Sequence, residues 1–327
     1  MKGNKLLTFA QQKLLLVAWK SLLLWLTVIL SFSYLTYILV TYEHYDALFS
    51  HLKLMTLTQF VWLAAVVLLL PVNLLLESLK WKLLVSGVQK IDLKSSIKAV
   101  LAGFSTGFFT PNRVGEMVGR IMYLDEGKRK PGVTMSVLNS LTQNLIMIMV
   151  GVPACIMFFV WTKAESGVNI QLYLLVLVFC FVGFGLLYFF FPLIIRRIKS
   201  NIYTRKISSY VSCLSDYSVI SLLKILLVSL LRYLIFSMQF YFMLQFFGVD
   251  FSLLAAAIAI PTTYLFVTFT PTLAFSEAAV RSSYAVLFIS AFSTQVAGIA
   301  LAGVCIWMVN TVIPMLAGTI VMAKTKM

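Results

Sequence analysis

Long, uncharged apolar runs alternate along this chain with short polar segments. A helix that crosses a bilayer needs about 20 mainly apolar residues, and most of the runs reach that length. The stretch 225–249 also qualifies, although Arg232 interrupts it. The pattern therefore predicts an all-α polytopic membrane protein. The uncharged runs are 21–42, 54–76, 99–112, 131–162, 170–195, 251–276 and 282–323.

The composition agrees with this pattern and excludes one class of partner. The chain is 61% hydrophobic and 11% charged, with a mean hydropathy of +0.97, which is outside the usual range of soluble domains. A net charge of +15 could indicate nucleic-acid binding. The basic residues lie instead in short connections between apolar runs, as the positive-inside rule expects. We therefore expect no nucleic-acid partner and a single membrane domain, 1–327, without a separate soluble catalytic domain.

The basic connections also predict the topology. The clusters at 80–98, 128–130 and 196–206 share one side of the membrane if two short segments enter the bilayer and turn back. These re-entrant helical hairpins are predicted at 97–125 and 252–290. About six full spans then remain, both termini are cytoplasmic, and the chain is expected in a bacterial cytoplasmic (inner) membrane.

The predicted elements form two inverted-topology repeats, each a span, a hairpin and a span. Such repeats bring broken helices together near the bilayer midplane, beside a polar cavity. The predicted parts are an N-terminal interfacial segment with a first span that is retained (1–56), repeat 1 (57–163), a linking span with a cytosolic surface helix (164–221) and repeat 2 (222–323).

Both hairpins carry a version of one motif. Residues 109–120 read FTPNRVGEMVGR, and residues 269–281 read FTPTLAFSEAAVR. Each has Phe-Thr-Pro, then a Glu, then an Arg four residues after that Glu. Charge within a membrane segment is costly and by default marks a functional site. Its duplication indicates a transporter built from two repeats.

The motif predicts a site for an anionic headgroup. Each Thr-Pro pair is typical of a helix N-terminus, whose free N–H groups attract anions. Arginine forks bind phosphate, and neighbouring glutamates hold the forks in place. Helical spacing puts Arg113, Glu116 and Arg120 on one face, and Glu277 and Arg281 on another. The predicted substrate-binding residues are Thr110, Pro111, Arg113, Glu116, Arg120, Thr270, Pro271, Glu277 and Arg281.

Other polar residues leave two readings open. Arg232 could line the cavity or snorkel to the surface. Asn139 and Gln143 could line the cavity or join helices by hydrogen bonds. The Glu–Arg pairs themselves could be structural salt bridges. Glu77 and Trp81 are interpreted as an interfacial anchor.

The sequence indicates no metal or cofactor. The four cysteines lie far apart and are interpreted as packed thiols. The two histidines share one predicted loop and have no cluster of partners. The residues concerned are Cys155, Cys180, Cys213, Cys305, His44 and His51.

The two motifs resemble the signatures of a known family, the lysylphosphatidylglycerol synthase membrane region, also called the flippase-like domain family. The first is similar to T-P-G-R-x-G-E…R, and the second to P-x-P-G-G-x-G-x-x-E, with Leu273, Ala274 and Phe275 where glycines are expected. Lys80-Trp81 resembles a basic–Trp pair of the family. The resemblance covers roughly residues 15–322. It implies a role in moving lipids between leaflets, in a stand-alone member without the cytosolic synthase domain.

We therefore expect a lipid flippase or transporter that moves an anionic or phosphate-bearing lipid by alternating access to a central polar cavity. One alternative is an integral-membrane transferase acting on a lipid-linked substrate, with Glu116 or Glu277 as base. The other is a non-transporting partner of an envelope lipid or glycan synthesis complex. The first reading predicts no enzymatic activity.

Overall fold

The computed structural model describes residues 55–162 and 217–325, residues 22, 25–37 and 39–42, and scattered positions between 175 and 190. The described residues are helical, with turns and short connections and no strand. The predicted linking span at 170–195 and the surface helix after it lie mostly outside the described residues. An apolar helix over Trp25–Thr41 falls on the predicted first span.

Four helical segments are long and apolar enough to cross a membrane. The 29 residues of α3 would extend about 43 Å, more than the hydrocarbon core requires. This finding confirms the predicted all-α membrane protein. The segments are α3 (Leu57–Val85), α6 (Arg129–Thr162), α9 (Val219–Phe246) and the continuous pair α12 (Val296–Trp307) and α13 (Ile313–Lys324).

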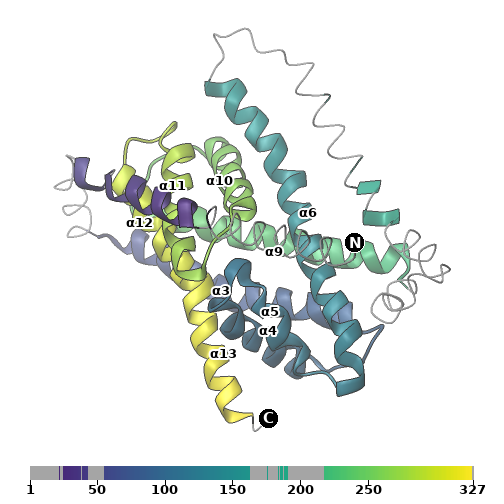
Figure 1. Ribbon diagram of the computed structural model, residues 1–327. Helices are drawn as coiled ribbons and strands as arrows, with labels where there is room; N and C mark the ends of the chain where they lie inside the picture. The colour runs from purple at the N-terminus through teal and green to yellow at the C-terminus, as the bar shows by residue number, and fades with distance from the viewer. Residues whose placement is uncertain are drawn as a thin grey trace, which may run out of the picture.

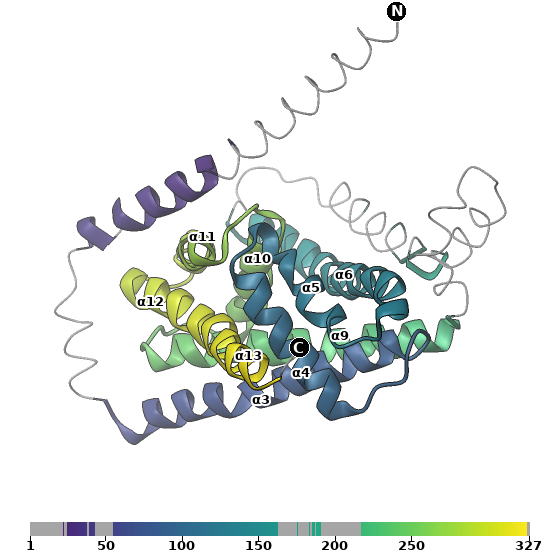
Figure 2. The same ribbon diagram turned by 60° about the horizontal axis from the view of Figure 1, so that its bottom comes forward.

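Two hairpins of shorter helices lie between these segments (Figures 1 and 2). The first consists of α4 (Leu93–Phe108) and α5 (Gly115–Ile121), joined by a 3₁₀ turn at Pro111–Arg113. The second consists of α10 (Leu253–Phe269) and α11 (Ala274–Ile289). The first hairpin begins four residues before the predicted position 97, because Asp92 caps α4 by accepting a hydrogen bond from Ser95 N.

Each hairpin ends close to where it starts. The Asp125 amide donates to the Gln89 side chain at 3.0 Å, which closes the first hairpin. The Asp250 amide donates to the Gln295 side chain at 3.1 Å, which closes the second. The entry and exit points of each hairpin are therefore neighbours.

The two halves of the chain interlock. Helix α4 packs against α13, α10 packs against α6, and α3 packs along α9. Glycines permit two of these approaches: a Cβ on Gly318 would overlap the Leu101 carbonyl oxygen, and a Cβ on Gly151 would lie 3.2 Å from the Pro261 carbonyl oxygen. Leu101 and Pro261 are 160 residues apart, the offset of the two motifs. Each hairpin therefore has its closest helix neighbour in the other half.

Candidate functional site

The tips of the two hairpins differ from the predicted helix starts. A 3₁₀ turn does begin at Pro111, but Asn112 and Arg113 have φ of 49° and 57°, so α5 starts only at Gly115. The hydroxyl of Thr110 accepts the Gly115 amide at 2.7 Å. In the second hairpin α11 starts at Ala274 with Leu273 as N-cap. The prediction that a helix begins at Pro271 is therefore wrong, because the chain after Thr270 remains extended and turns later.

The two hairpin tips bind each other. Asn112 N donates to Thr272 O at 2.9 Å, and Thr272 N donates to Asn112 Oδ1 at 2.9 Å. These residues occupy equivalent positions in the two motifs, 160 residues apart. The backbone amides of Asn112 and Thr272 are thus satisfied within the protein, as backbone groups away from water need to be.

Glu77 is the centre of a buried charge cluster. Its carboxylate lies 3.0 Å from Lys80 Nζ, 2.7 Å from Arg120 Nη1 and 3.2 Å from Arg232 Nη1. Asn139 Nδ2 donates to it at 2.9 Å. Glu77 is 1% exposed. Since α3, α5, α6 and α9 all contribute side chains, the cluster joins the first hairpin to three long helices.

Glu116 extends this cluster toward the hairpin tip. Its two oxygens lie 2.9 Å from Arg120 Nη2 and 2.8 Å from Arg113 Nε. Arg120 is only 2% exposed, and its guanidinium stands over the Trp81 ring at 5.7 Å. Two carboxylates and an aromatic face therefore hold this guanidinium in one orientation.

The second motif forms a separate ion pair. Arg281 Nη2 lies 2.6 Å from Glu277 Oε1, and the guanidinium stands 5.3 Å from the centre of the Tyr264 ring. The predicted pairing of Glu with the Arg four residues later is thus present in both hairpins. The predicted set does not form one cluster, because the two pairs face different cavities.

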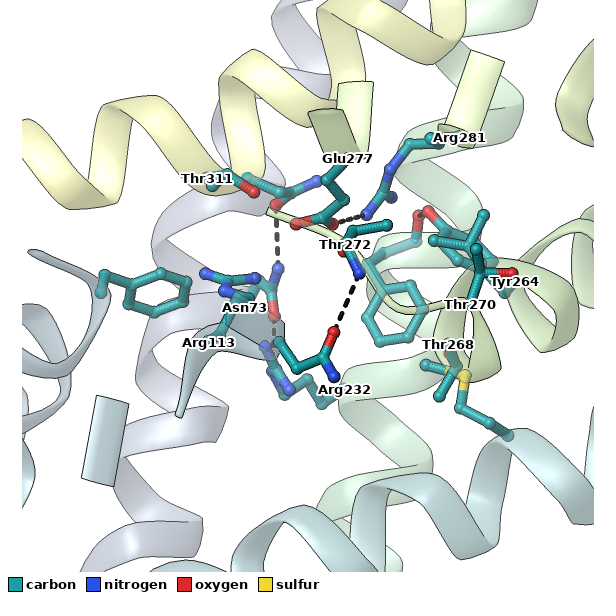
Figure 3. Close-up of a pocket in the computed structure, with 16 residues that line it drawn as sticks. Asn73, Arg113, Arg232, Tyr264, Thr268, Thr270, Thr272, Glu277, Arg281 and Thr311 are labelled. Carbon is teal, nitrogen blue, oxygen red and sulfur yellow. Dashed lines mark hydrogen bonds and ion pairs between the residues drawn. The ribbon is translucent and has the colours of Figure 1, made fainter. Parts of the chain in front are cut away.

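Two adjoining cavities lie beside these charges. We call the first, of about 580 Å³, the cation cavity, and its charged lining is Glu77, Lys80, Arg113, Glu116, Arg120 and Arg232. We call the second, of about 250 Å³, the hydroxyl cavity, for Thr268, Thr270, Thr272 and Thr311 in its lining (Figure 3). Glu277 and Arg281 line the hydroxyl cavity. The residues common to both linings are Asn112, Arg113, Arg232, Thr268 and Thr270.

The two cavities carry a surplus of positive charge. Five cationic side chains line them against three carboxylates, so Glu77 and Glu116 are each shared by more than one cation and a net charge of +2 remains. Within the described part of the chain, Arg113 Nη2 and Gln143 Nε2 are buried and lack a hydrogen-bond partner. Buried charge and unpaired donors are costly unless a ligand satisfies them. The arrangement is therefore suited to hold an anion.

The sequence allowed two interpretations of Arg232, Asn139 and Gln143, and all three residues belong to this site. Arg232 lines both cavities and donates to Asn73 at 3.0 Å. Gln143 lines the cation cavity and accepts from Lys80 at 3.2 Å and from Arg232 at 3.3 Å. Asn139 also lines this cavity while bonding Glu77. Cavity lining and hydrogen bonding between helices therefore coexist in these residues.

Glu77 and Trp81 are not an interfacial anchor. Both are buried, and Glu77 has three cationic partners. Asn73, Glu77 and Lys80 follow one another at i, i+4 and i+7 on a mainly apolar helix, so they share a face. This spacing is the feature of the sequence that could have indicated the buried cluster. It is easily overlooked because Glu77 directly follows the uncharged run 54–76 and so resembles a residue at the end of a span.

The described residues contain no group of three or more His, Cys, Asp or Glu that could hold a metal ion. Cys155 and Cys305 are free thiols. The remaining cysteines, Cys180 and Cys213, and both histidines lie outside the described residues.

Comparison with known proteins yields a family match that covers most of the chain. No curated protein and no solved structure matches it. Residues 22–318 match the family described as lysylphosphatidylglycerol synthase TM region. With that match and its four long apolar helices, the chain belongs to the lysylphosphatidylglycerol synthase TM region family of membrane proteins.

Proposed function

We propose that the protein is a lipid flippase or transporter that moves an anionic or phosphate-bearing lipid between leaflets. The observation that carries this proposal is the cation cavity, in which Lys80, Arg113 and Arg232 face an internal space within a bundle of apolar helices. Family membership supports a role in lipid metabolism or transport.

The charge arrangement favours a phosphate over a zwitterionic or neutral group. Arg120 is fixed by Glu77 and Glu116, whereas Arg113 and Arg232 have 26% and 18% of their side chains exposed. These two guanidinium groups are therefore the ones that can meet a ligand. Guanidinium groups bind phosphate oxygens in pairs of parallel hydrogen bonds.

Exposed apolar residues beside the cations support a lipid rather than a soluble anion. Val114, Val137, Leu141 and Phe269 line the cation cavity, and each is more than 45% exposed. A lipid whose phosphate enters this cavity can leave its acyl chains against these residues, in the bilayer. The apolar surface then needs no shielding from water.

We further propose that α4–α5 and α10–α11 are re-entrant hairpins that enter from opposite faces of the inner membrane of a bacterium, with both chain termini cytoplasmic. The neighbouring ends of each hairpin and the 160-residue offset of the paired tips support inverted repeats. In this topology the cation cavity faces the cytoplasm, and the hydroxyl cavity lies toward the outer leaflet. Transport would expose the two cavities alternately.

We favour transport over lipid-linked group transfer. Of the two carboxylates that could act as a base, Glu116 has both oxygens engaged by guanidinium groups at 2.8 and 2.9 Å, and Glu277 has one oxygen engaged at 2.6 Å. A general base needs a free lone pair within hydrogen-bond reach of the proton that it removes.

Reconstitution into liposomes with a fluorescent phosphatidylglycerol tests this function. A membrane-impermeant reductant destroys the fluorescence of labelled lipids in the outer leaflet only. A flippase moves labelled lipids from the inner leaflet to the outer leaflet, where the reductant reaches them. We expect faster loss of inner-leaflet label with the protein, and none with Arg113→Ala or Glu277→Ala. Lys224→Ala, which removes an exposed cation of α9 outside both cavities, is the matched control. No movement of any anionic lipid, with or without an imposed ion gradient, would refute the proposal.

A further inference from the structure

The long C-terminal helix changes its winding where it meets the hydroxyl cavity. Between α12 and α13, residues Met308–Val312 form a π-helical turn. The turn brings Asn310 and Thr311 into the cavity lining. π-Helical turns are rare and frequently occur at functional sites. The equivalent helix of the first half, α6, is α-helical throughout Arg129–Thr162. This wall of the hydroxyl cavity is therefore specific to the second half.

A chain of amide hydrogen bonds leaves one donor free in this wall. Arg232 Nε donates to Asn73 Oδ1 at 3.0 Å, and Asn73 Nδ2 donates to Asn310 Oδ1 at 2.9 Å. Because arginine can only donate, it fixes the orientation of both amides. Among the described residues, the buried Asn310 Nδ2 has no partner. The chain thus starts at a guanidinium shared by both cavities and ends in an unused donor (Figure 3).

The rest of the lining offers hydroxyl groups and aromatic rings. The side chains of Thr268, Thr272 and Thr311 contribute hydroxyl groups to this lining (Figure 3). Glu277 adds an acceptor to the same lining, whereas the rings of Phe104, Phe236 and Tyr264 supply flat apolar walls. A phosphate can only accept hydrogen bonds. This lining also presents acceptors, so it suits a ligand whose hydroxyl groups both donate and accept.

We propose that the hydroxyl cavity binds the uncharged, hydroxyl-rich part of a phosphodiester lipid headgroup, a sugar or polyol. Its phosphate is held by Arg113 and Arg232, which line both cavities. Hydroxyl groups bond Asn310, Thr272, Thr311 and Glu277, and the C–H faces pack on the rings. This inference rests on the proposed function, since it requires a phosphate-bearing lipid in the cation cavity.

Lipid binding to the purified full-length protein in detergent tests the inference. The probes are phosphatidylinositol, whose headgroup is a cyclic polyol, and phosphatidic acid of the same acyl chains, which has the phosphate alone. We expect phosphatidylinositol to bind about tenfold more tightly, since one or two added hydrogen bonds contribute roughly 1.4 kcal/mol. Equal affinity for the two lipids would overturn the inference.

Variants separate the two parts of the site. The double variant Thr272→Val/Thr311→Val removes two hydroxyl groups at nearly constant shape. We expect it to lose the preference for phosphatidylinositol and to bind phosphatidic acid as before. Thr58→Val removes a hydroxyl group at an exposed position of α3 outside both cavities, and it should change neither affinity. Weaker binding of both lipids to the double variant would contradict the inference, because the hydroxyls would then serve the fold.

The outcomes also distinguish this inference from the proposed function. If phosphatidic acid binds and Arg113→Ala abolishes its binding, the proposed phosphate site is supported, whether or not the protein prefers phosphatidylinositol. If the unchanged protein binds neither lipid, the proposed function and the inference both fail. The elution volume of each variant on a sizing column checks that it remains folded.

Discussion

Asn112 and Thr272 bind each other through two reciprocal hydrogen bonds of 2.9 Å, tip to tip. The pair stands where the cation and hydroxyl cavities adjoin, and Asn112 lines both of them. Residues of equivalent position in the two motifs thus join the hairpin tips beside both cavities.

Asn112 combines two properties that substitutions can separate. Its φ of 49° is accessible to Asn and Gly and unfavourable for other residues by about 1–2 kcal/mol. Its side chain also accepts the Thr272 amide. We expect Asn112→Gly to lose only the hydrogen bond, and Asn112→Ala to lose both and to be the less stable by about 1 kcal/mol. Thermal unfolding in detergent measures this order, and equal stability of the two variants would contradict it.

Removal of Glu77 should destabilise the protein more than any other carboxylate substitution. Three cations, of which Lys80 and Arg120 are buried, would lose their common counter-charge, and breaking a buried ion pair costs about 3–5 kcal/mol. We expect Glu77→Gln to reduce the yield of monodisperse protein severely. Glu126→Gln is the control, because Glu126 is 90% exposed and lies 3.8 Å from Arg129; its effect should stay below about 0.5 kcal/mol. Similar yields of both variants would argue against a central role for Glu77.

Glu277 and Arg281 should show strong coupling in a double-mutant cycle. Either single substitution, Glu277→Gln or Arg281→Gln, leaves an unpaired charge within the protein, whereas the double variant leaves none. We expect the double variant to be more stable than the sum of the single effects predicts, by about 1–3 kcal/mol. Additive effects in thermal unfolding would show that the pair does not act as a unit.

The re-entrant topology predicts which positions share a side of the membrane. Lys94, Gly127 and Thr294 are exposed: Lys94 lies in the first turn of α4, Gly127 follows hairpin α4–α5, and Thr294 follows α10–α11. In a background without native cysteines, Cys at 94 and 127 should react with an impermeant maleimide only from the cytoplasmic side. Cys at 294 should react only from the outside. Labelling of positions 94 and 127 from opposite sides would refute the hairpin.

The family, the helical membrane fold and both Glu–Arg pairs were predictable because each depends on local spacing. The sequence shows that Asn73, Glu77 and Lys80 share a helix face. The buried charge cluster around Glu77 also needs Arg120 and Arg232, which lie 43 and 155 positions after Glu77 in the sequence. The left-handed turn at Asn112 and the π-helical turn at Met308–Val312 left no local signal that we recognised. These features follow from tertiary contacts, which override local preference. The binding roles of the motif residues stay predictions.

The exchange of packing partners between the two halves affects how the protein is made. Ser105, near the end of α4, donates to the carbonyl of Met315, 210 residues later. During translation the first hairpin therefore emerges long before α13 can cover it, at about 5–20 residues per second. Over this interval its polar tip needs temporary shelter, which a membrane insertase or chaperone could give. Deletion of the last turns of α13 should therefore impair the folding of the first hairpin, although that hairpin is synthesised much earlier.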